Sequence, residues 1–82
     1  MKKISKDELK RMLMQLDGWH MLPGGVDNML IDTVYKQMTR GTWENGNPKR
    51  IFRAHCYYCV QYQNGMWWHY DLINKGYVTT NS

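Results

Sequence analysis

Residues 57–70 read YYCVQYQNGMWWHY, in which two runs of alternating side chains flank a Gln-Asn-Gly turn. Half-buried strands alternate with a period of two, and glycine accepts the left-handed conformation that a three-residue hairpin loop needs. A loop over residues 63–65 sets three cross-strand pairs: Tyr62–Met66, Val60–Trp68 and Tyr58–Tyr70. This register gathers apolar side chains on one face, whereas a two-residue loop mixes both faces. We therefore expect the three-residue loop.

The hairpin extends outward from this turn. We expect strands from Ile51 to Tyr62 and from Met66 to Ile73, with a short third strand over Tyr77–Thr80. Alternation assigns one face to the core: Phe52, Ala54, Cys56, Tyr58, Val60, Tyr62, Met66, Trp68, Tyr70 and Leu72. The other face holds Arg53, His55, Tyr57, Cys59, Gln61, Trp67, His69 and Asp71. This second face mixes aromatic and basic residues and suits binding; the alternative is that a loop or a second copy of the chain covers it.

A first helix is predicted from Ser5 to Asp17. Ser5 and Glu8 have the spacing of a capping box, in which side chains bond the free N–H groups of the first turn. Apolar residues then recur at helical spacing and give one narrow stripe: Leu9, Met12, Leu13 and Leu16. Gly18 stands where a left-handed C-terminal cap is expected.

A second helix is predicted from Asp27 to Arg40, with Asp27 as its N-cap. Four apolar residues lie four apart: Val26, Leu30, Val34 and Met38. The choice between helix and strand stays open, because several residues there also suit a strand: Ile31, Thr33, Val34 and Tyr35. The chain is thus expected to be a single small α+β domain over residues 1–82. Two N-terminal helices would pack on a C-terminal antiparallel β-hairpin or three-stranded meander.

The composition limits the classes of function. The 82 residues include 11 Lys and Arg against 7 Asp and Glu, a net charge of +4 that favours acidic partners. No stretch approaches the ~20 apolar residues of a membrane-spanning helix. The opening Met1-Lys2-Lys3 looks like the start of a signal peptide, but no apolar segment follows it in Ile4–Glu8, so secretion is not expected. Two cysteines are too few for a disulfide scaffold. We expect a cytoplasmic protein that does not engage a membrane.

Cys56 and Cys59 form a Cys-x-x-Cys string, but inside a strand the two thiols point to opposite faces and share no metal. Cys56 is then a core thiol. Cys59 lies across from His69, with Asp71 further along. This arrangement permits a thiol nucleophile or, with His20 or His55, a zinc site. A flat sheet face offers no pocket for catalysis. We expect no enzymatic activity and no cofactor, and keep Cys59, His69 and His55 as alternative metal ligands.

These features are typical of a small non-enzymatic binding protein, of the accessory, inhibitor or regulator type that phages, other mobile elements and bacteria encode. The expected partner is a protein, bound through the aromatic and basic surface of the hairpin. The expected contact residues are Lys49, Arg50, Arg53, His55, Tyr57 and Trp67. One alternative is a nucleic-acid-binding module, in which single-stranded bases stack on Tyr57 and Trp67 while Lys49, Arg50 and Arg53 hold phosphates. The other is a small zinc or thiol protein. A homodimer stays open, because a small sheet has edges to protect.

Overall fold

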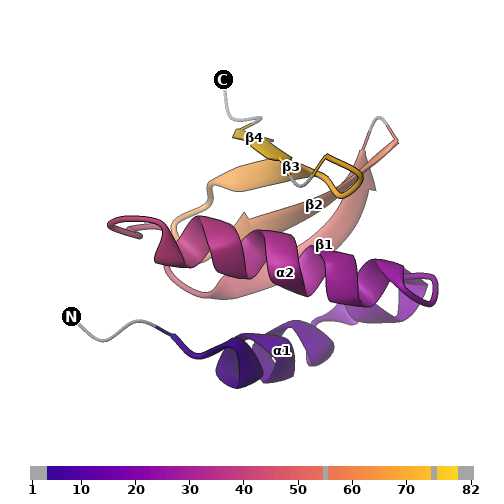
Figure 1. The fold of residues 1–82 in the computed structure, drawn as a ribbon, viewed down its shortest axis with the longest axis horizontal. Helices are drawn as coiled ribbons and strands as arrows, with labels where there is room; N and C mark the ends of the chain where they lie inside the picture. Colours follow the sequence, from indigo (N-terminus) through magenta and orange to yellow (C-terminus); the bar gives the residue numbers. More distant parts are fainter. Residues whose placement is uncertain (1–3, 55, 75, 80–82) are drawn as a thin grey trace.

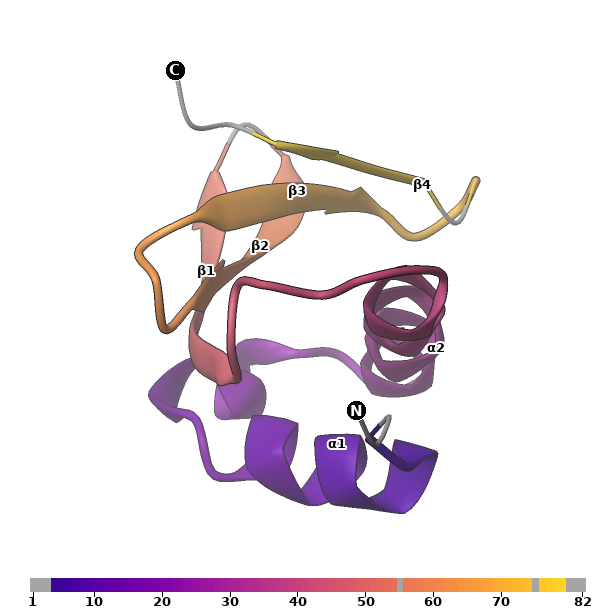
Figure 2. The same ribbon diagram turned by 90° about the vertical axis from the view of Figure 1, so that its left-hand side faces the viewer.

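Two α-helices and a four-stranded antiparallel sheet make up the computed structural model, which describes residues 4–54, 56–74 and 76–79. The elements in chain order are α1 (Lys6–Met14), the 3-10 helix η1 (Asp17–Met21), α2 (Val26–Thr39), β1 (Pro48–Ala54), β2 (Tyr57–Tyr62), β3 (Trp67–Asp71) and β4 (Gly76–Thr79). The strands lie in the order β1-β2-β3-β4, and α1 and α2 lie on the same side of the sheet (Figure 1, Figure 2). The α+β class is confirmed, with N-terminal helices and C-terminal strands.

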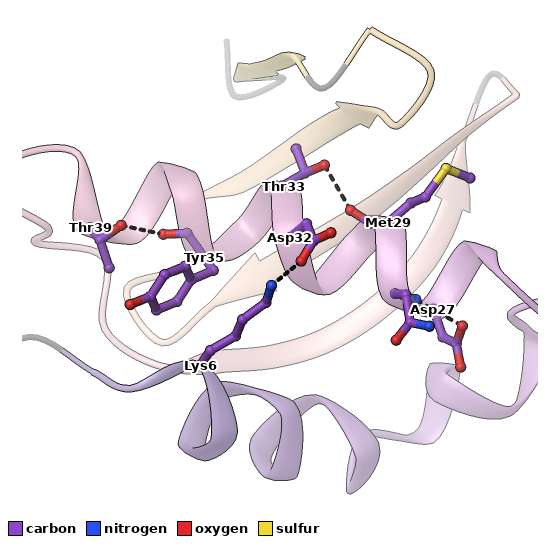
Figure 3. Close-up of polar contacts among 8 residues, drawn as sticks. Lys6, Asp27, Met29, Asp32, Thr33, Tyr35 and Thr39 are labelled. Carbon is purple, nitrogen blue, oxygen red and sulfur yellow. Dashed lines mark hydrogen bonds and ion pairs between the residues drawn. The ribbon is translucent and has the colours of Figure 1, made fainter.

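Helix α1 begins as predicted, since the Ser5 hydroxyl accepts a hydrogen bond from the Glu8 N–H at 3.2 Å. It ends at Met14, earlier than expected. An ion pair joins Lys6, at the start of α1, to Asp32, in the middle of α2 (Figure 3). Both side chains are about half exposed, so this contact adds little to the stability of the fold.

Helix α2 is a helix and not a strand. Three residues of the predicted stripe, Leu30, Val34 and Met38, are buried, whereas Val26 is partly buried. Ile31, beside the stripe, is buried as well. The predicted N-cap is wrong, because Gly25, with a φ of 88°, stands at that position. Asp27 lies in the first turn instead, where its Oδ1 accepts a hydrogen bond from the Asn28 N–H. A carboxylate there still complements the positive end of the helix.

The turn between β2 and β3 has the predicted three residues. Tyr58 pairs with Tyr70 and Val60 with Trp68. The Gly65 N–H donates to the Tyr62 carbonyl at 2.9 Å, and Gly65 has the left-handed φ of 90° that this loop needs. The register of the hairpin is therefore confirmed.

The stretch from Ile51 to Tyr62 is not one strand. The chain reverses between Ala54 and Tyr57, where Cys56 adopts a left-handed φ of 70°, and β1 folds back antiparallel on β2. Because of this reversal, the side chains of β1 point to the opposite sides of the sheet from those that were predicted. Phe52 and Ala54 were predicted on the core face but lie on the opposite face, since Phe52 pairs with Cys59. Arg53 lies on the core face, since it pairs with Tyr58.

Gly18 does not cap α1. It lies in η1, packed directly on the backbone of Ile51 in β1, where a Cβ atom would stand 1.9 Å from the Ile51 carbonyl oxygen. Only glycine permits so close an approach. Gly18 therefore seats η1 against β1, which is an edge strand of the sheet.

We expect Gly18→Ala to lower the free energy of unfolding by about 2 kcal/mol or more, because the added methyl group forces η1 away from β1. Gly24→Ala is the matched control, since a Cβ atom there would meet nothing within 4 Å. Urea denaturation followed by tryptophan fluorescence measures both. Equal midpoints for the two variants would show that the contact between Gly18 and Ile51 is unimportant.

The core between the helices and the sheet contains one buried polar network. The hydroxyl of Tyr70 donates to Oε1 of Gln37, and it also hydrogen-bonds the hydroxyl of Tyr62. Because the Tyr70 proton goes to Gln37, Tyr62 is the donor between the two tyrosines. Burial raises the pKa of both phenols, so both stay neutral. The network joins α2 to β2 and β3.

Removing the central hydroxyl of this network is expected to cost more than removing the terminal one. Tyr70→Phe leaves both Tyr62 and Gln37 without a partner in the network and should cost about 2–3 kcal/mol, whereas Tyr62→Phe should cost about 1 kcal/mol. Thermal and urea unfolding of the two variants give the comparison. If Tyr62→Phe proved the more damaging, the order of donors would be wrong.

Candidate functional site

The side of the sheet opposite α1 and α2, here called the outer sheet face, carries the candidate site. Its residues follow from the strand pairing: Arg50, Phe52, Ala54, Tyr57, Cys59, Gln61, Trp67, His69 and Asp71. In this register Phe52, Cys59 and His69 form one row across β1, β2 and β3, and Arg50, Gln61 and Trp67 form the next.

Four rings on this face form one aromatic cluster, made of Phe52, Tyr57, Trp67 and His69. The centroids of Phe52 and Trp67 lie 5.1 Å apart, and those of Trp67 and His69 lie 5.6 Å apart with an interplanar angle of 75°. Tyr57 stacks on His69 at 5.1 Å and is 41% exposed. Because the rings already hold each other, ordering them on binding costs little entropy.

Arg50 supplies the positive charge of the outer sheet face. Its guanidinium carbon lies 4.7 Å from the centroid of the Phe52 ring, in cation–π geometry. A bulge in β1 places it there, because Pro48 pairs with Tyr62 and Arg50 with the next residue, Gln61. Lys49 is the additional residue in this bulge and is exposed.

The two cysteines exchange the environments that were predicted for them. Cys56 is exposed in the turn between β1 and β2, whereas Cys59 is completely buried beneath the aromatic cluster. Burial raises the pKa of the Cys59 thiol to about 11. At neutral pH this side chain is a neutral packing group, which opposes the alternative of a thiol nucleophile.

We expect iodoacetamide at neutral pH to modify Cys56 in the folded protein and to leave Cys59 unreacted, because Cys56 is exposed whereas the Cys59 thiol is buried and has a raised pKa. Mass spectrometry of the peptides gives the extent at each position, and urea should make both react. A Cys56→Ser chain provides the control. Labelling of that folded chain at the rate of a free thiol would overturn the assignment of Cys59.

The structure brings some of the predicted contact residues together and separates others. Tyr57, Trp67 and Arg50 lie on the outer sheet face. Arg53 lies on the helix side, with its guanidinium carbon 4.9 Å from the centroid of Tyr58. His55 lies outside the described residues. Phe52 was missed, because it was assigned to the core on the assumption that residues 51–62 run as one strand.

The alternative metal site finds little support in the described part of the chain, which contains no group of three or more His, Cys, Asp and Glu side chains placed to hold an ion. Cys59 and His69 do pair across β2 and β3, and His55 falls outside that part. Asp71 is engaged elsewhere. Its carboxylate accepts hydrogen bonds from the side chain and the backbone N–H of Asn74, which lower its pKa.

Three comparisons with known proteins found no relative of this chain. No family model, curated protein or solved structure matches the chain. None of the helices in the described ranges is long and apolar enough to cross a membrane.

Proposed function

We propose that this chain is a non-enzymatic binding protein that docks on another protein through its outer sheet face. The observation that carries the proposal is the pre-packed aromatic cluster on the side of the sheet opposite α1 and α2. Tyr57 and Trp67 are the anchors, because large rings in a rigid setting give the most binding energy per residue. The desolvated thiol of Cys59 fills the space beneath them.

The charge of the surface supports a protein partner over a nucleic acid. Arg50 lies on the outer sheet face, but Arg53 lies on the helix side and Asp71 adds a negative charge to the face. A surface that holds a strand of phosphates needs a row of cations beside the rings. The arginines that were predicted to hold phosphates, Arg50 and Arg53, lie on opposite faces of the sheet.

The partner that fits is a protein surface with an apolar centre and an acidic rim. The aromatic cluster needs apolar side chains, and carboxylates at the rim would meet Arg50 and Lys49. With a net charge of +4, such a rim would also speed the encounter. We place this activity in the cytoplasm, where the free thiols of Cys56 and Cys59 stay reduced. An accessory protein, inhibitor or regulator acts by this kind of docking.

Peptides from a random display library, selected on the immobilised full chain, provide the probe. We expect the selected peptides to be apolar and acidic, and we expect Trp67→Ala and Tyr57→Ala each to weaken their binding by about tenfold or more. Arg50→Ala should weaken binding in a salt-dependent way. Arg53→Ala and Ile73→Ala are matched controls, because both residues are exposed, Arg53 lies on the helix side and Ile73 lies in the turn after β3.

Two other outcomes would contradict the proposal. Saturable quenching of tryptophan fluorescence by a single-stranded oligonucleotide, lost with Arg50→Ala and steeply dependent on salt, would indicate a nucleic-acid-binding module. A dimer in sedimentation experiments that Trp67→Ala converts to a monomer would show that a second copy of this chain occupies the outer sheet face.

A further inference from the structure

Two asparagines that are far apart in sequence hold a loop against the hairpin. The Asn64 Nδ2 donates to the Asn45 Oδ1 at 2.7 Å, and the Asn64 N–H donates to the Asn45 carbonyl at 3.2 Å. Gln63 and Asn47 add two more hydrogen bonds between the same segments, each of 3.1 Å. We call the pair Asn45 and Asn64 the asparagine clasp. It fastens residues 42–47 to the turn between β2 and β3.

Both asparagines of the clasp are followed by glycine. In an Asn-Gly pair the glycine nitrogen loses its proton and attacks the side-chain amide carbon, and ammonia leaves as a cyclic succinimide closes. Water then opens the ring to aspartate or isoaspartate, so that an amide and water become a carboxylic acid and ammonia. Glycine favours this reaction because it has no Cβ to hinder the attack.

The fold protects Asn64 from this reaction. The attacking nitrogen is occupied, because the Gly65 N–H donates to the Tyr62 carbonyl at 2.9 Å. The carboxamide is held at both ends, since its Oδ1 accepts from the Met66 N–H at 3.0 Å and its Nδ2 donates to Asn45. Ring closure at Asn64 has to break these bonds and open the hairpin turn.

Asn45 is in the opposite situation. Among the residues that the structure describes, the Gly46 N–H has no hydrogen-bond acceptor, and the Asn45 carboxamide has a single partner, the Asn64 Nδ2. That partner contacts the carbonyl oxygen, which is where negative charge develops when the glycine nitrogen adds to the amide carbon. A hydrogen-bond donor already placed at that oxygen stabilises the tetrahedral intermediate.

We propose that Asn45 is a site of spontaneous conversion to aspartate or isoaspartate in the folded protein, with Asn64 as the positioning residue that is itself protected. The conversion adds one negative charge, which changes the net charge from +4 to +3. A carboxylate at Asn45 still accepts from Asn64 Nδ2, so the aspartate product keeps the clasp.

Trypsin separates the two positions, which makes the comparison direct. Cleavage after Arg40 and Lys49 places Asn45 on the peptide 41–49, and cleavage after Arg53 and Lys75 places Asn64 on the peptide 54–75. The full chain is aged in mildly alkaline buffer, folded or in urea, and the mass increase of each peptide is followed. Fragment ions assign the modified residue. Asn47 is no competitor, because the nitrogen of Pro48 has no proton to lose.

We expect Asn45 to convert at least about tenfold faster than Asn64 in the folded chain, and at a similar rate to Asn64 in urea, because both precede glycine. The positioning role is tested with Asn64→Asp, which replaces the donor by an acceptor and should slow conversion at Asn45. If the clasp merely restrained the loop, the same variant would accelerate it. Asn74→Ala, in another turn, is the control and should change neither rate.

The wild-type comparison stands even if Asn64→Asp fails to fold, which circular dichroism would show. Equal rates for the two asparagines in the folded chain, or faster conversion at Asn64, would overturn the proposal. Faster conversion at Asn45 in a folded Asn64→Asp chain would overturn the role of Asn64.

Discussion

The reversal of the chain between Ala54 and Tyr57 determines which residues reach the outer sheet face. Side chains alternate along a strand, so the turn that joins β1 to β2 sets the side to which every residue of β1 points. Cys56 adopts a left-handed conformation to make this turn, which costs about 1–2 kcal/mol for a residue other than glycine. Pairing of β1 along β2 offsets that cost and carries Phe52 to the aromatic cluster.

The sequence predicts the parts of the fold that depend on local signals. It does not predict the parts that depend on contacts between residues distant in sequence. Gly65 and Ser5 act on their own neighbours, so the register of the β2–β3 hairpin and the start of α1 were predictable. The turn at Cys56 contains no proline, and no glycine or asparagine marks its left-handed position. Gly18 matches a local rule for helix ends, yet a contact with Ile51, distant in sequence, determines its role.

The same distinction explains the candidate site. Tyr57 and Trp67 were found from the hairpin alone, because the β2–β3 register places both on one face. Phe52 was missed because the turn at Cys56 was not predicted. The burial of Cys59 was missed with it, because rings from neighbouring strands cover this thiol. Because Cys59 is desolvated, the outer sheet face has the chemistry of a packing surface, which supports the docking function that we propose.

The bulge in β1 connects the asparagine clasp to the outer sheet face. Pro48 is buried and follows directly on the loop that the clasp holds. Because Lys49 is the additional residue of the bulge, Pro48 can face the core while Arg50 still reaches the outer sheet face and stacks on Phe52. The position of the Arg50 guanidinium therefore depends on where the loop places Pro48. Asn45, the proposed site of conversion, lies in this loop three residues before Pro48.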